Sequence, residues 1–342
     1  QSSQSTMFTR TAFVVISFCL FLELAIATMN RRVSAAFLVM PHRNLSTKRP
    51  RYQQSSLAST VKEDGSPSTE SQVPIYRREG IFVVEKPSEW SSQDVVGYIR
   101  GILERDARSR GANPARLSRR GSRSQKKRMV RVGHGGTLDP LATGVLVLGV
   151  GSGTKDLTNY LSGTKGYEAS VELGFETTTL DMEGNVTKTE PYDHVTLAAI
   201  EEIIPKFVGD IQQVPPIFSA LSKNGKRLYQ EAREGKTAED VGLEAREVTV
   251  HKLELLNTDH KGQGLPCFGL KVECGGGVYI RSLVRDIGYD LSTVATMSQL
   301  RRTKQGMFTI EHALKKPEWS ADAIYDAMER TSSMIENVER AT

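Results

Sequence analysis

The sequence predicts an α+β fold with a mixed central β-sheet flanked by helices. Short apolar stretches favour strands near residues 81–84, 144–150, 167–173, 248–256 and 270–274. Strands and helices alternate along the chain, but without the regular βαβ rhythm that builds a wholly parallel sheet. We therefore expect parallel and antiparallel strands in one sheet.

The first 75 residues are predicted to be a targeting presequence and linker. Residues 12–22 form an apolar run, which Glu23 interrupts and which is too short for a comfortable membrane span. Residues 24–61 contain no acid, while Arg, Lys, Ser and Thr recur, as in transit peptides. A secretory-type signal followed by such a stretch favours plastid import, with a mitochondrial presequence as the alternative. No membrane association is expected after processing.

The loop that precedes the strand at 144–150 is the most informative part of the chain. It reads GHGGTLDPLATG from Gly133 to Gly144 and holds Asp139 between glycines and Pro140. Pro140 disfavours helical geometry for Asp139, and the glycines allow close backbone approach. With one histidine and no second acid nearby, the pattern indicates a nucleophile rather than a metal site. An ordinary Asp-Pro turn, in which the aspartate bonds its own backbone, is the alternative.

Two tyrosines and an arginine are candidates for a pocket around this acid. Tyr167 lies in the strand at 167–173, where alternation alone makes it a core residue. Tyr279 and Arg281 are two residues apart, so in a strand both would point into one cleft. A desolvated carboxylate needs a nearby cation to stay ionised, and Arg281 is the candidate partner of Asp139. Surface packing at a strand end is the alternative for both.

The loop at 133–144, followed by GSGTK at 151–155, resembles the catalytic motif of the TruB family of tRNA pseudouridine synthases. Further segments resemble the family in the same order, at residues 84–96, 165–168, 214–235, 276–281 and 300–302. Together they cover roughly residues 76–314. The resemblance implies the pseudouridine synthase fold, with Asp139 in a central catalytic cleft.

The resemblance also implies a reaction and a set of residues. The reaction is isomerisation of uridine to pseudouridine in the tRNA T-loop (position 55), without cofactor or metal, after the uridine is flipped out of the loop. Asp139 is the implied nucleophile, and attack on the sugar or on the base both stay open. The implied catalytic residues are Asp139, Tyr167 and Arg281, and the implied substrate or RNA contacts are His134, Tyr167, Tyr279, Leu300, Lys86 and Lys155.

Some of these roles have alternatives. Lys86 and Lys155 either hold the active loop or touch phosphate. Leu300 is the expected apolar wall of the pocket, and Arg301 and Arg302 are expected to contact the RNA backbone. The partner implied is the T-arm of tRNA, and a monomer without an obligate protein partner is expected.

The expected domain organisation has three parts. A catalytic domain spans residues 76–315 and carries a basic insertion at about 104–130, in which Asp106 is the lone acid between Arg105 and Arg131. The insertion either raises RNA affinity in a salt-dependent manner or is a surface loop without a role. Residues 316–342 are expected to be a tail, too short for a PUA-type RNA-binding domain.

Two rival functions need to be weighed. Glycines at 149, 151 and 153 follow an apolar strand, which prompts a nucleotide-binding oxidoreductase, but the full G-x-G-x-x-G spacing is lacking. The second rival is an RNA-folding chaperone that binds tRNA without modifying it. Cys267 and Cys274 match no metal motif, and the net charge of +5 agrees with RNA binding without establishing it.

Overall fold

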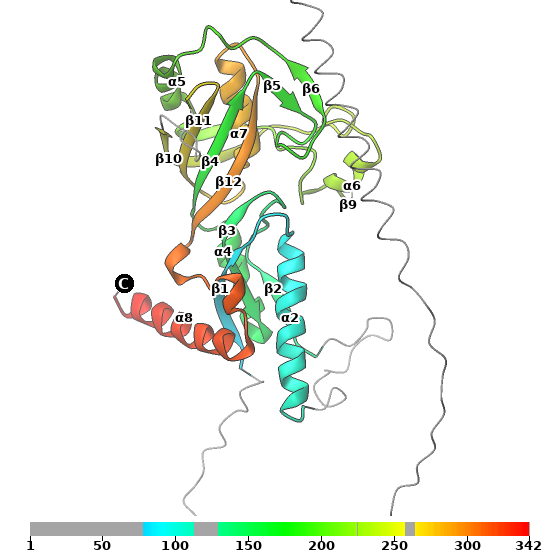
Figure 1. The fold of residues 1–342 in the computed structure, drawn as a ribbon, viewed down its shortest axis with the longest axis vertical. Helices are drawn as coiled ribbons and strands as arrows, with labels where there is room; N and C mark the ends of the chain where they lie inside the picture. The colour runs from blue at the N-terminus through cyan, green and yellow to red at the C-terminus, as the bar shows by residue number, and fades with distance from the viewer. Residues whose placement is uncertain (1–77, 113–128, 224, 257–263, 342) are drawn as a thin grey trace, which may run out of the picture. The chain divides into compact units, whose positions relative to one another are not determined.

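The computed structural model describes residues 78–112, 129–223, 225–256 and 264–341 (Figure 1). The predicted presequence and most of the predicted basic insertion lie outside the described residues. The part of the insertion that is described corrects its boundary, because helix α2 (Ser92–Ser109) continues through the residues where the insertion was expected to begin. Ser91 and Asp94 form a capping box at the start of this helix.

A mixed β-sheet forms the framework of the described residues. Its main path runs β1-β3-β12-β4-β11-β10-β7, with β2 added to β3 and β13 added to β12. The β12–β3 pair is parallel and the other pairs in this sheet are antiparallel, which confirms the predicted fold class. The strands are β1 (Gly80–Lys86), β2 (Val132–His134), β3 (Thr143–Val150), β4 (Lys165–Leu173), β7 (Gly209–Gln213), β10 (Arg246–Leu256), β11 (Cys267–Cys274), β12 (Ala295–Gln305) and β13 (Phe308–Thr309).

Two hairpins and several helices complete the described structure. The hairpins pair β5 (Phe175–Thr177) with β6 (Val186–Thr189) and β8 (Ser222–Lys223) with β9 (Lys226–Arg227). Besides α2, the α-helices are α4 (Leu157–Ser162), α5 (Leu197–Ile203), α6 (Leu228–Arg233), α7 (Ile280–Asp290) and α8 (Ala321–Ala341). Short 3₁₀ helices are η2 (Gly151–Thr154), η3 (Ile204–Phe207), η4 (Ile310–His312) and η5 (Lys316–Glu318).

All five predicted strands are present, but the long strand β12 was not predicted. Its sequence, ATMSQLRRTKQ, is too polar to read as a buried strand. It is nevertheless paired on both sides, with β3 and with β4, and Arg302 and Gln305 are buried in it. Tertiary pairing therefore overrides the local pattern here.

Two large apolar clusters cover different parts of the sheet. One joins β4, β11 and β12 to α7, and the other joins β1 and β3 to α2 and α8. Figure 1 shows α2 beside β2 and α8 beside β1, whereas α7 lies near β4 and β12. Residues 316–342 were expected to be a tail outside the core. That expectation is wrong for this part of the chain, because Trp319, Tyr325 and Met328 belong to the second cluster.

Candidate active site

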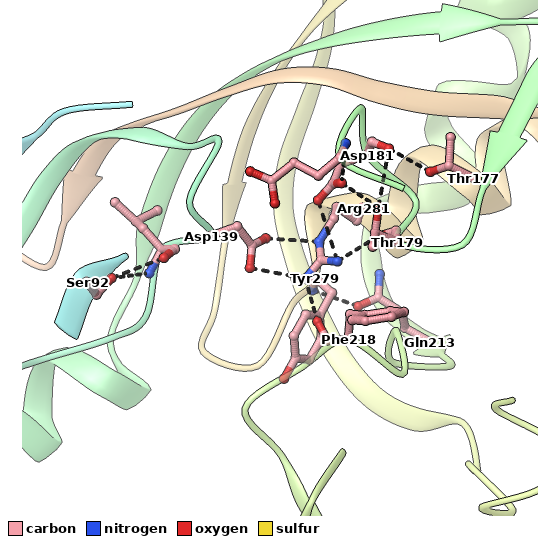
Figure 2. A network of polar contacts seen from close by, with 11 residues as sticks. Ser92, Asp139, Thr177, Thr179, Asp181, Gln213, Phe218, Tyr279 and Arg281 are labelled. Carbon is pink, nitrogen blue, oxygen red and sulfur yellow. Dashed lines mark hydrogen bonds and ion pairs between the residues drawn. The ribbon is translucent and has the colours of Figure 1, made fainter. Parts of the chain in front are cut away.

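The loop between β2 and β3 presents Asp139, and buried groups outside the loop fix its path. The Ser92 hydroxyl accepts a hydrogen bond from the Leu138 N–H at 2.8 Å and lies 3.1 Å from the Leu138 carbonyl, to which it donates. The Glu89 N–H donates to the Pro140 carbonyl at 2.9 Å. Residues on both sides of Asp139 are therefore anchored to the start of α2 (Figure 2).

Lys86, at the end of β1, anchors the same loop. Its side chain is fully buried, and its ammonium donates to the carbonyls of Pro140 at 3.0 Å, of Pro87 at 2.8 Å and of Trp90. Burial lowers the pKa of Lys86 to about 8, against the nearby charge of Asp139. Because the ammonium is used by the protein's own carbonyls, the structure favours the loop-holding role over the predicted contact with RNA.

Replacing Ser92 should loosen the loop. Ser92→Ala leaves the buried N–H and carbonyl of Leu138 without their partner, so we expect a loss of about 1–3 kcal/mol in the free energy of unfolding, measured in urea. Ser88→Ala is the matched control, because Ser88 also donates to a loop carbonyl, at 3.3 Å from Leu141, but is exposed. Equal losses in the two variants would contradict the anchoring role of Ser92.

Arg281 forms the centre of a polar network that includes Asp139. Its Nη2 donates to Asp139 Oδ1 at 3.1 Å, and its Nε lies 2.9 Å from Asp139 Oδ2. The same guanidinium donates to the carbonyls of Thr179 at 2.6 Å and Phe218 at 2.8 Å. The Arg281 side chain is only 4% exposed, so its ion pair with Asp139 is shielded from solvent on the arginine side. The predicted pairing of Arg281 with Asp139 is confirmed in geometry.

The route by which Arg281 reaches Asp139 differs from the prediction. Tyr279 and Arg281 do not lie in a strand: Tyr279 precedes α7, and Arg281 lies in its first turn. The apolar spacing of Ile280, Leu283 and Ile287 marks a helix face that the two-residue strand argument overlooked. Tyr279 still lies in the network, since its N–H donates to the Gln213 side chain at 2.8 Å and Figure 2 places its ring beside Arg281.

Asp181 is a member of the site that the sequence did not reveal. Its carboxylate lies 3.7 Å from Arg281 Nη1 and accepts hydrogen bonds from the Thr179 hydroxyl at 2.5 Å and the Glu183 N–H at 3.1 Å. Figure 2 shows Arg281 between the two aspartates. An acid before a glycine turn is too common in sequences to have identified it.

Asp139 is partly exposed to solvent, and opposing electrostatic effects act on its pKa. Its side chain is 30% exposed, which leaves the carboxylate approachable. Burial raises its pKa above the ordinary aspartate value, Asp181 adds to this, and the charges of Arg281 and Lys86 oppose it. Arg281 therefore offsets the desolvation of Asp139 only in part.

The raised pKa of Asp139 predicts an acid limit to the reaction. A protonated carboxyl cannot attack, so the rate should fall as the pH drops through a pKa above the ordinary 3.8. Asp181→Asn removes a negative charge that raises this pKa, so it should move the fall in rate to lower pH. Single-turnover rates measured across pH check both points. If the rate of the Asp181→Asn variant fell at the same pH as that of the parent protein, the fall would not report the protonation of Asp139.

Tyr167 and Leu300 lie beside the loop in one apolar cluster with Leu138 and Ala142. Tyr167 is 8% exposed and Leu300 is 7% exposed. Burial raises the pKa of Tyr167, the charge of Arg302 opposes this, and Asp139 adds to it. Their placement agrees with a pocket wall, and their roles stay predictions.

The other predicted contacts fall in different settings. His134 in β2 is partly buried, its Nδ1 accepts from the Gly136 N–H at 3.4 Å, and burial lowers its pKa. Lys155 is exposed after η2, and its role stays a prediction. Arg301 is 44% exposed and pairs with Glu85 at 3.1 Å. The expectation that Arg302 contacts the RNA backbone is wrong, because it is only 1% exposed.

The glycine-rich turn after β3 does not form a phosphate cradle. A Cβ at Gly149 would lie 2.6 Å from the Gly153 carbonyl oxygen, and one at Gly153 would lie 2.3 Å from that of Gly80. These glycines are needed because the chain packs against itself, which removes the basis for the oxidoreductase alternative. Within the described residues, no group of three His, Cys, Asp or Glu could hold a metal ion. No helix of the described residues is long and apolar enough to cross a membrane.

Comparisons with known proteins agree with this arrangement. The model described as TruB family pseudouridylate synthase (N terminal domain) matches residues 123–280, and the tRNA pseudouridylate synthase B C-terminal domain matches residues 281–341. Pseudouridylate synthase TRUB1 of Mus musculus is 43% identical over 292 residues, covering 82% of this chain and 81% of the mouse protein. TRUB1 of Homo sapiens is 46% identical over 75% of this chain and 69% of its own length.

A bacterial relative and a solved structure also match. The tRNA pseudouridine synthase B of Thermobifida fusca (strain YX) is 41% identical over 71% of this chain and 75% of its own length. A crystal structure of a Cbf5-Nop10-Gar1 complex aligns with a TM-score of 0.48 and 26% identity, over 72% of this chain and 55% of that chain. The chain thus spans little more than half the length of this structural match.

Proposed function

The chain belongs to the TruB family of pseudouridylate synthases, and we propose that it converts uridine to pseudouridine in the T-loop of tRNA. The observation that carries the proposal is the Asp139 carboxylate, clamped by Arg281 at 2.9 and 3.1 Å on a loop pinned by Ser92 and Lys86. A folding chaperone that only binds RNA would have no use for an acid held in this way.

The reaction is an isomerisation, so it needs a nucleophile and proton transfers but no redox partner. The N1–C1′ bond of the uridine breaks, a C5–C1′ bond forms, the proton on C5 leaves and N1 gains one. Asp139 attacks the sugar or the base and forms a transient covalent link, which divides a difficult step into two easier ones. Tyr167 moves a proton, and Tyr279 and Leu300 line the uracil pocket. Both aromatic rings offer the flipped base a replacement for its lost stacking.

A direct assay tests the proposal. The protein is incubated with an unmodified tRNA transcript, and pseudouridine is mapped by carbodiimide labelling and primer extension. We expect one product site, in the T-loop, and none in a transcript whose T-loop uridine is replaced by cytidine. Binding of the transcript without product would overturn the proposal and leave the chaperone alternative.

We propose that the protein acts as a monomer on tRNA without an obligate protein partner. Support comes from the site itself, since Asp139, Arg281, Tyr167 and Tyr279 come from one chain. Light scattering on the purified protein should give the mass of one chain, both alone and while it is active. A dimer mass during turnover would contradict this.

We propose that the protein is imported into a plastid. The support is compositional: an apolar run at residues 12–22, then the acid-free stretch at 24–61. Residues 1–75 fused to a fluorescent protein should direct it to the plastid in an alga with complex plastids. Mitochondrial fluorescence would favour the alternative presequence.

A further inference from the structure

Within the described residues, Arg302 in β12 is among the largest side chains that are almost completely buried. It is 1% exposed, and within the described part of the chain no carboxylate forms an ion pair with it. A buried charge without a counter-ion is unfavourable unless other polar groups satisfy it. The groups that surround Arg302 therefore indicate what it does.

Two of these groups belong to the catalytic loop and the strand that follows it. Arg302 Nε donates to the Val145 carbonyl at 2.7 Å, and Nη2 donates to the Gly136 carbonyl at 3.1 Å. The backbone of Arg302 also packs against this segment. A Cβ added at Gly144 would lie 2.2 Å from the Arg302 carbonyl oxygen, so only glycine fits there. Arg302 thus contacts the backbone on both sides of Asp139, at Gly136 before it and at Gly144 and Val145 after it.

The third group is the Tyr167 side chain. Arg302 and Tyr167 are directly opposite one another in the β12–β4 pair. Directly opposite residues of neighbouring strands share one face of the sheet, so the guanidinium lies on the same side as the Tyr167 ring, and its charge opposes the rise in the tyrosine's pKa that burial causes. Cys274 and Asp139 also act on Tyr167, and both raise that pKa. Arg302 is therefore a buried cation on the face of the sheet that carries the Tyr167 side chain.

We propose that Arg302 is a positioning residue, which holds the Tyr167 hydroxyl in a fixed place relative to the Asp139 loop. The inference rests on the proposed function, in which Tyr167 moves a proton. The guanidinium is planar and can satisfy two carbonyls and one hydroxyl at once, whereas a lysine could not keep this geometry. In this scheme the Tyr167 hydroxyl gives its proton to N1, and the phenolate, which the guanidinium stabilises, takes up the C5 proton, so the side chain ends protonated as it began.

Kinetics of a double-mutant cycle test the proposal. Arg302→Lys keeps a positive charge, and we expect its single-turnover rate to fall about 10- to 100-fold, with tRNA affinity unchanged. In a Tyr167→Phe background, Arg302→Lys should cause a clearly smaller loss, because the hydroxyl is gone and only the contacts with the carbonyls of Gly136 and Val145 remain to be disturbed. Lys304→Met is the matched control: it lies in the same strand, is 40% exposed and should leave the rate unchanged. Losses that add in the double variant would overturn the proposal.

A second measurement needs no substrate. Tyrosines labelled with ¹³C at Cζ report their hydrogen bonding by NMR, and Tyr167→Phe assigns the Tyr167 signal. We expect Arg302→Lys to shift this signal and Lys304→Met to leave it in place. An unmoved signal would overturn the contact between Arg302 and Tyr167. A shifted signal in a protein that forms no pseudouridine would instead show that the contact stands while the proposed function fails.

Discussion

Asp139→Asn should abolish pseudouridine formation, lowering the single-turnover rate by at least about 10³-fold. The amide has the shape of the carboxylate but cannot act as the nucleophile. The fold should survive, because desolvation disfavours the charged form of Asp139 and the variant removes that charge.

Three measurements separate chemistry from folding in this variant. Pseudouridine is quantified under single-turnover conditions, tRNA affinity by filter binding, and thermal unfolding by circular dichroism. Affinity and melting temperature should stay close to those of the parent protein. A variant that still forms product at a tenth of the parent rate would exclude Asp139 as the nucleophile.

Arg281→Gln should have the second largest effect, on stability as well as on activity. It leaves the carboxylates of Asp139 and Asp181 near one another without their shared cation, and the Asp181 side chain is only 3% exposed. Breaking a buried pair in this way costs about 3–5 kcal/mol. The free energy of unfolding in urea should fall by that amount, and product formation should be lost.

A second substitution distinguishes the two effects of Arg281→Gln. Adding Asp181→Asn removes one uncompensated charge, so part of the lost stability should return. Activity should not return, because Asp139 still lacks its partner. Recovery of activity in the double variant would show that Arg281 acts only by stabilising the fold.

The parts of the site that could be predicted are those whose local sequence is distinctive. The glycines and Pro140 around Asp139 mark a constrained loop, and apolar runs mark the strands on either side of it. The pairing with Arg281 was predicted for the wrong reason, since the side chain comes from a helix rather than a strand. A local pattern constrains the residue types near an acid, but not the element that delivers the cation.

The parts that could not be predicted depend on contacts between distant segments. Ser92 reaches Leu138 across 46 positions, and Arg281 reaches Thr179 across 102. The sequence of β12 is polar and does not predict a strand. It becomes one because it pairs with β3 on one side and β4 on the other. No window of sequence contains these relations, so Asp181, Ser92 and Arg302 gain their meaning only in the folded chain.

Helix α8 has a consequence for how the protein is made. It packs on β1 and α2, and the Leu314 N–H and carbonyl also bond the backbone of β1. The earliest described strand therefore completes its core only with the latest described helix, and contacts so distant in sequence form slowly. During synthesis, Phe82 and Leu146 remain uncovered by α8 until residues 321–341 have left the ribosome. Over that interval these apolar side chains are available for contacts with other chains, so the nascent protein is prone to aggregation.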